Sequence, residues 1–136
     1  MVRVMPINIR WFDDTKRIIL WEIIGSWTLD EMHKIYSEGN GMCAQVPENT
    51  INALIDMTRS NSIPSNIFSA LSARTRTETP NYDMAVIVSN NRMVKGFVNV
   101  FNTIPVLRGQ FVVVSTLGQA LSFIEKRRSE RESTQA

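Results

Sequence analysis

A polar cluster follows an apolar run in the stretch LIDMTRSNSIPSNIF, which begins at Leu54. The side chains there that could bind an anion or a protein partner are Thr58, Arg59, Ser62, Ser65 and Asn66. Arginine offers two parallel N–H donors to a phosphate or a carboxylate, and serine can be phosphorylated. The stretch is therefore a candidate recognition loop, with Ser65 and Ser62 as candidate phosphorylation sites.

A helix is predicted directly after this loop, over residues 65–75, and its first turn would add to such a site. The free amides and the positive dipole end of a helix favour a phosphate or a carboxylate. A phosphate on Ser65 would be stabilised there and would add a charge of roughly −1.5 to −2 to any docking surface. The alternative is structural: Ser62 or Ser65 caps the helix, and Pro64 fixes the direction of its first turn.

Other groups that could do chemistry are few and scattered. Asp56 ends the apolar run, and a carboxylate at that point most simply accepts loop amides and anchors the turn. His33 and Cys43 are the single histidine and the single cysteine, too few for a metal site. No phosphate-binding glycine loop and no nucleophile elbow occurs. The sequence therefore predicts no metal, no cofactor and no enzymatic activity.

The elements that position the loop can be read from hydrophobic periodicity. Residues 7–12 alternate apolar and polar side chains, the period of a half-buried strand. Residues 17–24 form a more buried run that is rich in β-branched and aromatic side chains. The DDTK segment between them supplies turn chemistry, so the two runs predict a hairpin.

Three more strands and four amphipathic helices follow in alternation. The apolar runs that predict strands cover residues 51–57, 84–89 and 110–115. The helices are predicted over residues 28–45, 65–75 and 90–104 and from Thr116 onward. Thr28 with Glu31 and Thr116 with Gln119 have the spacing of capping boxes, which mark helix starts.

The element order predicts an α/β protein of one domain. Strands that alternate with helices form a largely parallel sheet, so we expect a mixed, mostly parallel five-stranded sheet with four helices, in the order ββαβαβαβα. The hairpin would add an antiparallel edge. The domain is predicted to cover residues 1–128. Residues 129–136 are expected to form a polar, flexible tail, because they lack an apolar face.

The order of elements and three local motifs resemble the STAS domain, the fold of the bacterial anti-sigma-factor antagonists and of the cytosolic tails of sulfate transporters. The motifs are GSWTLDE, LIDMT and FVVVSTLGQALSFI, which begin at Gly25, Leu54 and Phe111. The chain looks closest to uncharacterised bacterial STAS-like proteins with a WT-x-DE helix start and a TLxxAL finish. The resemblance covers roughly residues 7–124.

The resemblance implies a regulatory domain that binds a protein partner, such as a kinase or an anti-sigma-like protein. In the antagonists, a serine at the start of the helix after the third strand is phosphorylated by the partner kinase, which breaks the complex. Those proteins have Asp-Ser-Ser-Gly or close variants where this chain has IPSN. Only Ser65 falls at the position of that serine, and the flanking acid and glycine are absent.

Composition and charge limit the cellular compartment and the classes of partner that we expect. Among 136 residues, 15 are basic and 13 are acidic, so the chain lacks the strong positive charge that favours nucleic-acid binding. No apolar run is long enough to span a bilayer, no signal-peptide pattern is present, and the single cysteine fits a reducing cytosol. We therefore expect a cytoplasmic protein with no nucleic-acid partner and no membrane insertion. An aromatic side chain left exposed on the hairpin would suit a homodimer contact.

Three functions remain open at this point. The first is the regulatory, non-enzymatic domain that binds a protein partner and is controlled by phosphorylation near the start of the second helix. The second is a small-molecule or lipid-binding module with an apolar pocket between sheet and helices. The third is a hydrolase whose residues are too scattered for a motif.

Overall fold

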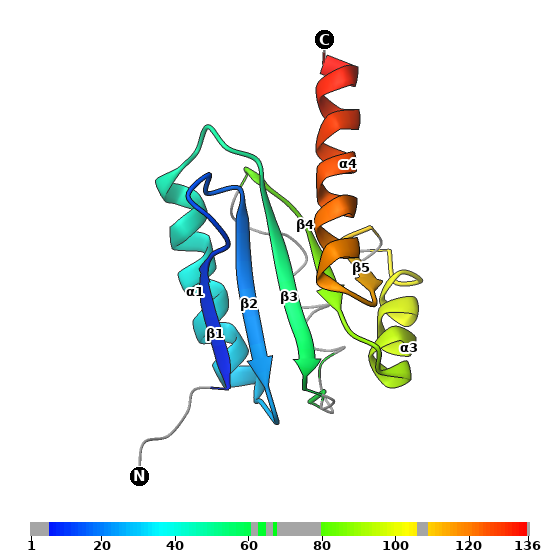
Figure 1. Ribbon diagram of the computed structural model, residues 1–136. Helices are drawn as coiled ribbons and strands as arrows, with labels where there is room; N and C mark the ends of the chain where they lie inside the picture. The colour runs from blue at the N-terminus through cyan, green and yellow to red at the C-terminus, as the bar shows by residue number, and fades with distance from the viewer. Residues whose placement is uncertain (1–5, 61–62, 65–66, 68–79, 106–108, 136) are drawn as a thin grey trace.

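The computed structural model describes residues 6–60, 63–64, 67, 80–105 and 109–135 (Figure 1). The elements within them are β1 (Ile7–Trp11), β2 (Ile18–Ile24), α1 (Leu29–Gln45), β3 (Ile51–Arg59), β4 (Tyr82–Val88), α3 (Arg92–Phe101), β5 (Phe111–Val114) and α4 (Leu117–Gln135). Three of the four predicted helices therefore lie in the described part of the chain. The predicted helix over residues 65–75 lies outside it, apart from Ile67.

The strands form one five-stranded sheet in the order β1-β2-β3-β4-β5. β1 pairs antiparallel with β2, and every later neighbour is parallel. This is the mixed, mostly parallel α/β sheet with an antiparallel hairpin that the sequence predicts. Because β2 to β5 run in the same direction, their last residues lie at one edge of the sheet, which we call the carboxyl edge.

Helices α1 and α3 cover one face of the sheet. Their buried side chains pack together with residues of the strands in one core: Ile7, Ile23, Met32, Ile35, Met57, Ile67, Ile87, Val94, Val98 and Phe101. α1 packs tightly on the hairpin at Gly39, where an added Cβ would lie 3.3 Å from Ile9 Cδ1. The glycine that lowers helix propensity thus permits close packing of α1 on the hairpin.

Both predicted capping pairs are confirmed. The Thr28 hydroxyl accepts a hydrogen bond from the Glu31 amide at 3.2 Å, at the start of α1. At the start of α4, the Thr116 hydroxyl accepts from the Gln119 amide at 3.1 Å, and the Gln119 side chain accepts from the Thr116 amide at 3.2 Å. Each cap satisfies amides that the first helical turn leaves without a partner.

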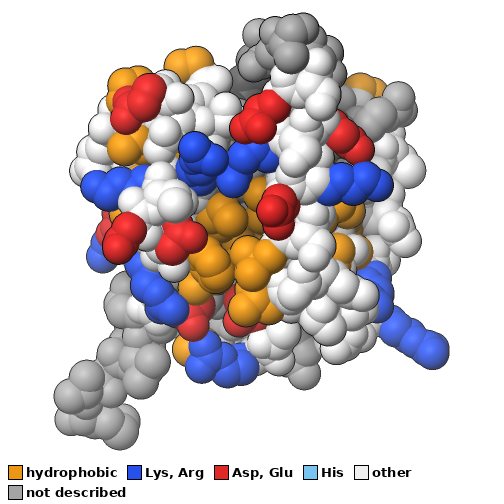
Figure 2. Space-filling view, turned by 45° about the horizontal axis from the view of Figure 1, so that its top comes forward, with side chains coloured by type: hydrophobic (Ala, Val, Ile, Leu, Met, Phe, Trp, Pro, Cys, Tyr) orange, Lys and Arg blue, Asp and Glu red, His pale blue; other side chains and the backbone are white. Residues whose placement is uncertain are grey.

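Helix α4 lies on the opposite face, where its buried Ala120 and Ile124 pack with Leu54 and Val86 of the sheet. Figure 2 shows apolar side chains gathered beside a helix on one face of the molecule, with basic side chains above them. The helix continues to Gln135, so the predicted polar tail is helical over residues 129–135, and its flexibility stays a prediction. The sequence pattern missed this because the second half of α4 is held by ion pairs and not by an apolar face.

Candidate functional site

The predicted recognition loop begins at the carboxyl edge, where open α/β sheets place their ligand crevices. Thr58 and Arg59 are the last two residues of β3, and both are exposed. Ser62, Ser65 and Asn66 lie outside the described residues. Their part in binding or phosphorylation therefore stays a prediction.

Asp56 holds the end of β3 in a fixed conformation. Its Oδ1 accepts hydrogen bonds from the amide of Thr58 at 2.9 Å and from the hydroxyl of Thr58 at 2.6 Å. An aspartate that binds the backbone two residues later closes an Asx turn. Thr58 is thereby fixed where the strand passes into the loop.

Arg59 and Ser60 connect β3 to the end of β2. The Arg59 guanidinium pairs with Glu22 at 2.9 Å, and Arg10 pairs with the other oxygen of the same carboxylate. The Ser60 hydroxyl donates to the Gly25 carbonyl at 2.6 Å, and the Gly25 amide donates to the Arg59 carbonyl at 3.0 Å. Arg59 therefore presents a charge that it already shares with Glu22.

A crevice of about 350 Å³ opens beside Thr58 and Arg59. Its second wall is the segment after β4, where the Ser89 hydroxyl accepts from the Asn91 amide at 3.1 Å. Asn91 in turn caps α3, because its side-chain oxygen accepts from the Met93 amide at 2.8 Å. The described residues that line the crevice are Met57, Thr58, Arg59, Ser60, Ser89, Asn90 and Asn91.

Sequence reasoning missed the second wall of this crevice. The signal was the SNN segment, residues 89–91, which follows an apolar strand just as the predicted loop follows β3. The two segments come together because β3 and β4 are neighbouring parallel strands. Among the described residues that line the crevice there is no carboxylate, histidine or thiol. Such a set can donate and accept hydrogen bonds, and the guanidinium of Arg59 can attract an anion.

Two apolar side chains stand exposed at the same edge. Met93, in the first turn of α3, is 45% exposed, and Leu117, in the first turn of α4, is 46% exposed. The Lys95 ammonium donates to the Ser115 hydroxyl at 3.5 Å, which connects α3 to the end of β5. The carboxyl edge thus combines a polar crevice with exposed apolar side chains.

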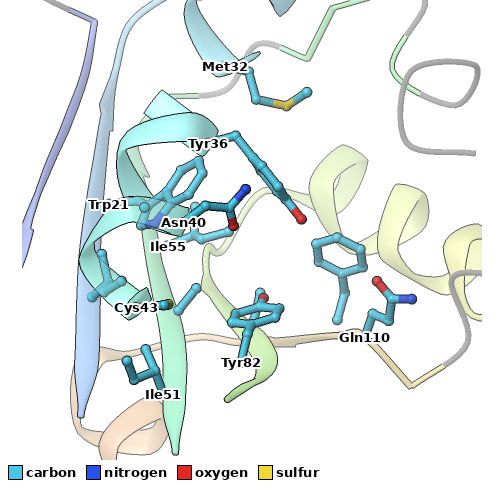
Figure 3. A pocket seen from close by; sticks show the side chains of 14 residues that line it. Trp21, Met32, Tyr36, Asn40, Cys43, Ile51, Ile55, Tyr82 and Gln110 are labelled. Carbon is cyan, nitrogen blue, oxygen red and sulfur yellow. The ribbon is translucent and has the colours of Figure 1, made fainter. Parts of the chain in front are cut away.

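An apolar cavity of about 100 Å³ lies between α1 and the sheet. Tyr36 and Asn40 reach it from α1, and Tyr82 and Gln110 lie on the side of β4 and β5 (Figure 3). The rest of its described lining is mainly aliphatic and aromatic. A cavity with apolar walls and a few polar groups is suited to a small, mainly apolar molecule.

Burial acts on two ionisable groups that line this cavity, Tyr82 and Cys43. It raises the pKa of Tyr82 and the pKa of the Cys43 thiol, so both side chains stay protonated at neutral pH. A protonated, buried thiol is a poor nucleophile. These two groups are therefore uncharged at neutral pH, which suits a small, mainly apolar molecule in the cavity.

The described residues contain neither a cluster of metal ligands nor a membrane-spanning helix. In those ranges, no three histidine, cysteine or acidic side chains come together as metal ligands. No helix in the described part of the chain combines the length and the apolar character needed to cross a bilayer.

Comparison with known proteins identifies the fold. No protein-family model and no curated protein matches the sequence. Among solved structures, this chain is similar to an uncharacterized DUF3478-family protein with a SpoIIAA-like fold from Shewanella loihica PV-4, with a TM-score of 0.65 and 15% sequence identity. The match covers 90% of this chain and 97% of that chain. The protein therefore has the SpoIIAA-like, STAS-type fold that its sequence motifs predict.

Proposed function

We propose that this protein is a non-enzymatic regulatory domain that binds a protein partner at the carboxyl edge of its sheet, in the cytoplasm. The observation that carries the proposal is the crevice in which Thr58 and Arg59 of β3 face Asn90 and Asn91 of the segment after β4. A SpoIIAA-like fold is compatible with such a role.

Two features of the edge favour a protein as its ligand. Protein interfaces combine a small apolar centre with polar groups at the rim. Met93 is exposed two residues beyond Asn91 of the crevice, and Leu117 is exposed at the start of α4, after β5, the strand next to β4. A few such anchors supply most of the binding energy in known interfaces, so Met93 is the side chain whose loss should weaken the complex most.

Phosphorylation near the predicted second helix would control this contact. Ser65 and Ser62 follow β3 closely in the chain, and a phosphate adds roughly −1.5 to −2 charges. A partner that fits the edge without that charge would meet repulsion or a desolvation cost after modification. Ser60 is not a candidate, because it is 5% exposed and its hydroxyl donates to the Gly25 carbonyl.

The test is affinity capture from cells that naturally express the protein, with two matched variants of α3. Met93→Glu places a charge in the proposed contact, and Val100→Glu places the same charge at a position of similar exposure (45% and 47%) farther along the helix. Thermal unfolding of both variants checks that they fold. We expect wild type and Val100→Glu to recover the same partner and Met93→Glu to lose it. Equal recovery by the two variants, or no partner with wild type, would contradict the proposal.

A second candidate function is the binding of a small apolar molecule in the cavity beside α1. The observation that favours it is the cavity itself, with apolar walls and the polar groups of Tyr36, Asn40 and Gln110. Native mass spectrometry of the purified protein would show a bound molecule as added mass. Ala53→Val would place two methyl groups in the cavity and should remove that mass. A mass that equals the sequence mass in both proteins would rule out a tightly bound ligand.

A further inference from the structure

A second polar cavity lies at the opposite edge of the sheet, where β3 and β4 begin. It has a volume of about 200 Å³ and lies between the hairpin turn, the segment before β3 and the second half of α4. Its cationic side chains are Arg17, Arg128 and Arg131. None of the three lines the crevice at the carboxyl edge or the apolar cavity beside α1.

The buried carboxylate at this cavity is already satisfied. Asp83, with 5% of its side chain exposed, accepts from Arg127 at 2.7 and 3.0 Å and pairs with Arg131 at 3.3 Å. Asn52 donates to the same carboxylate at 3.0 Å. Both oxygens of Asp83 therefore already accept hydrogen bonds, and neither is paired with Arg128.

In this arrangement Arg128 forms no ion pair with a described acidic side chain. Its Nη2 atom is buried and has no hydrogen-bond partner among the described residues. No ion pair within the described ranges involves the side chain of Arg128 or Arg17. A buried, unpaired donor on a charged group is costly, and a small shift of the guanidinium toward the cavity that Arg128 lines would let this nitrogen bind a polar group there.

The other acidic side chains near the cavity do not pair with the Nη2 atom of Arg128. Hydrogen bonds from Thr15 lower the pKa of Asp13, with smaller contributions from Arg128 and Arg17, so this carboxylate lies near both arginines but is bound by its own turn. Glu48 and Glu132 line the cavity as exposed residues, where solvent screens their charge. Among the arginines that the structure describes, only Arg128 has a guanidinium nitrogen that is both buried and unpartnered.

We propose that this cavity binds a phosphate group, as inorganic phosphate or as a soluble phosphomonoester, through Arg128 with Arg17 and Arg131. A phosphate presents several acceptor oxygens at once, and the planar fork of arginine matches two of them. Arg17 and Arg131 come to the cavity from the hairpin and from the turn of α4 after Arg128, so three guanidinium groups surround one space.

The experiment measures the thermal unfolding midpoint of the full chain in increasing sodium phosphate, with sodium chloride keeping the ionic strength constant. Glycerol 3-phosphate in a parallel series distinguishes a monoester from free phosphate. A ligand of the folded state raises the midpoint in proportion to its binding. Arg128→Gln tests the proposed site, and Lys126→Gln removes one exposed charge from the same helix as a matched control. Arg17→Gln is a second test variant outside α4.

We expect phosphate or its monoester to raise the midpoint of wild type and Lys126→Gln equally. Arg128→Gln and Arg17→Gln should bind about tenfold more weakly or worse, which removes most of that rise. Without phosphate, Arg128→Gln should be no less stable than Lys126→Gln, because the substitution removes a buried donor that has no partner among the described residues. Equal midpoints in phosphate and chloride for wild type would overturn the proposal. An undiminished rise in both arginine variants, or a large loss of stability in Arg128→Gln alone, would also overturn it.

Discussion

Asp83 on β4 and Arg127 on α4 form a two-point ion pair, with distances of 2.7 and 3.0 Å, between residues 44 positions apart in the chain. Asn52 on β3 donates to the same carboxylate at 3.0 Å, and Arg131 reaches it from the next turn of α4. This contact attaches the polar second half of α4 to the sheet.

Replacing Asp83 with asparagine should lower the free energy of unfolding by about 2 kcal/mol, because it removes a buried, charged acceptor from its donors. The helix signal in circular dichroism should fall as the end of α4 frays. Urea denaturation measures the first effect. Asp14→Asn, in the exposed hairpin turn, is the control and should change little. Equal stability of the two variants would contradict this role of Asp83.

The same carboxylate should make stability depend on pH in acid. Burial alone would raise the pKa of Asp83, but hydrogen bonds from Arg127 and Asn52 outweigh it and hold that pKa below its usual value. A group of this kind adds stability above its unfolded pKa of about 4 and loses it as the pH falls through the lower, folded pKa. Urea denaturation at pH steps below about 4 should therefore show a steeper loss of unfolding free energy in wild type than in Asp83→Asn. Parallel curves would show that Asp83 does not titrate in this way.

The turn at the end of β3 depends on Asp56. Asp56→Ala removes both hydrogen bonds to Thr58 and should cost about 1 kcal/mol of unfolding free energy. Thr58→Ala keeps the bond from its amide and should cost less. Hydrogen exchange of the Thr58 amide should become faster in Asp56→Ala only. An unchanged exchange rate there would mean that Asp56 does not anchor the strand end.

Much of the fold could be predicted because its signals are local. The capping pairs Thr28–Glu31 and Thr116–Gln119 lie three residues apart, and the apolar runs mark strands by their own composition. The STAS-type fold followed from the order of these elements. Thr58 and Arg59 could be placed at a strand end for the same reason.

The features that the sequence did not reveal depend on distant contacts. Asn90 and Asn91 join the crevice because β4 lies beside β3, a pairing that no local pattern encodes. The second half of α4 pairs through Arg127 with Asp83, which lies inside a strand and far from Arg127 in the chain. The unpaired Arg128 likewise becomes evident only once Asp83 is seen to be occupied.

If the protein is phosphorylated in its native cells, the phosphate should be on Ser65 or Ser62. Ser60 lies in the same stretch but should stay unmodified, because it is 5% exposed and its hydroxyl is bound at 2.6 Å to the Gly25 carbonyl. Peptide mass spectrometry can assign the modified serine. The double variant Ser62→Ala with Ser65→Ala is the control and should carry no phosphate. Modification of Ser60 would mean that this strand end opens in solution.

Site-specific photo-cross-linking in native cells tests the central claim, partner binding at the carboxyl edge, most directly. A photoreactive amino acid at Asn90 lies in the proposed contact, and the same amino acid at Glu48 lies at the opposite edge on an equally exposed residue. We predict that the probe at position 90 cross-links one discrete protein and that the probe at position 48 does not cross-link this protein. The same adduct from both positions, or no adduct from Asn90, would contradict a partner site at this edge.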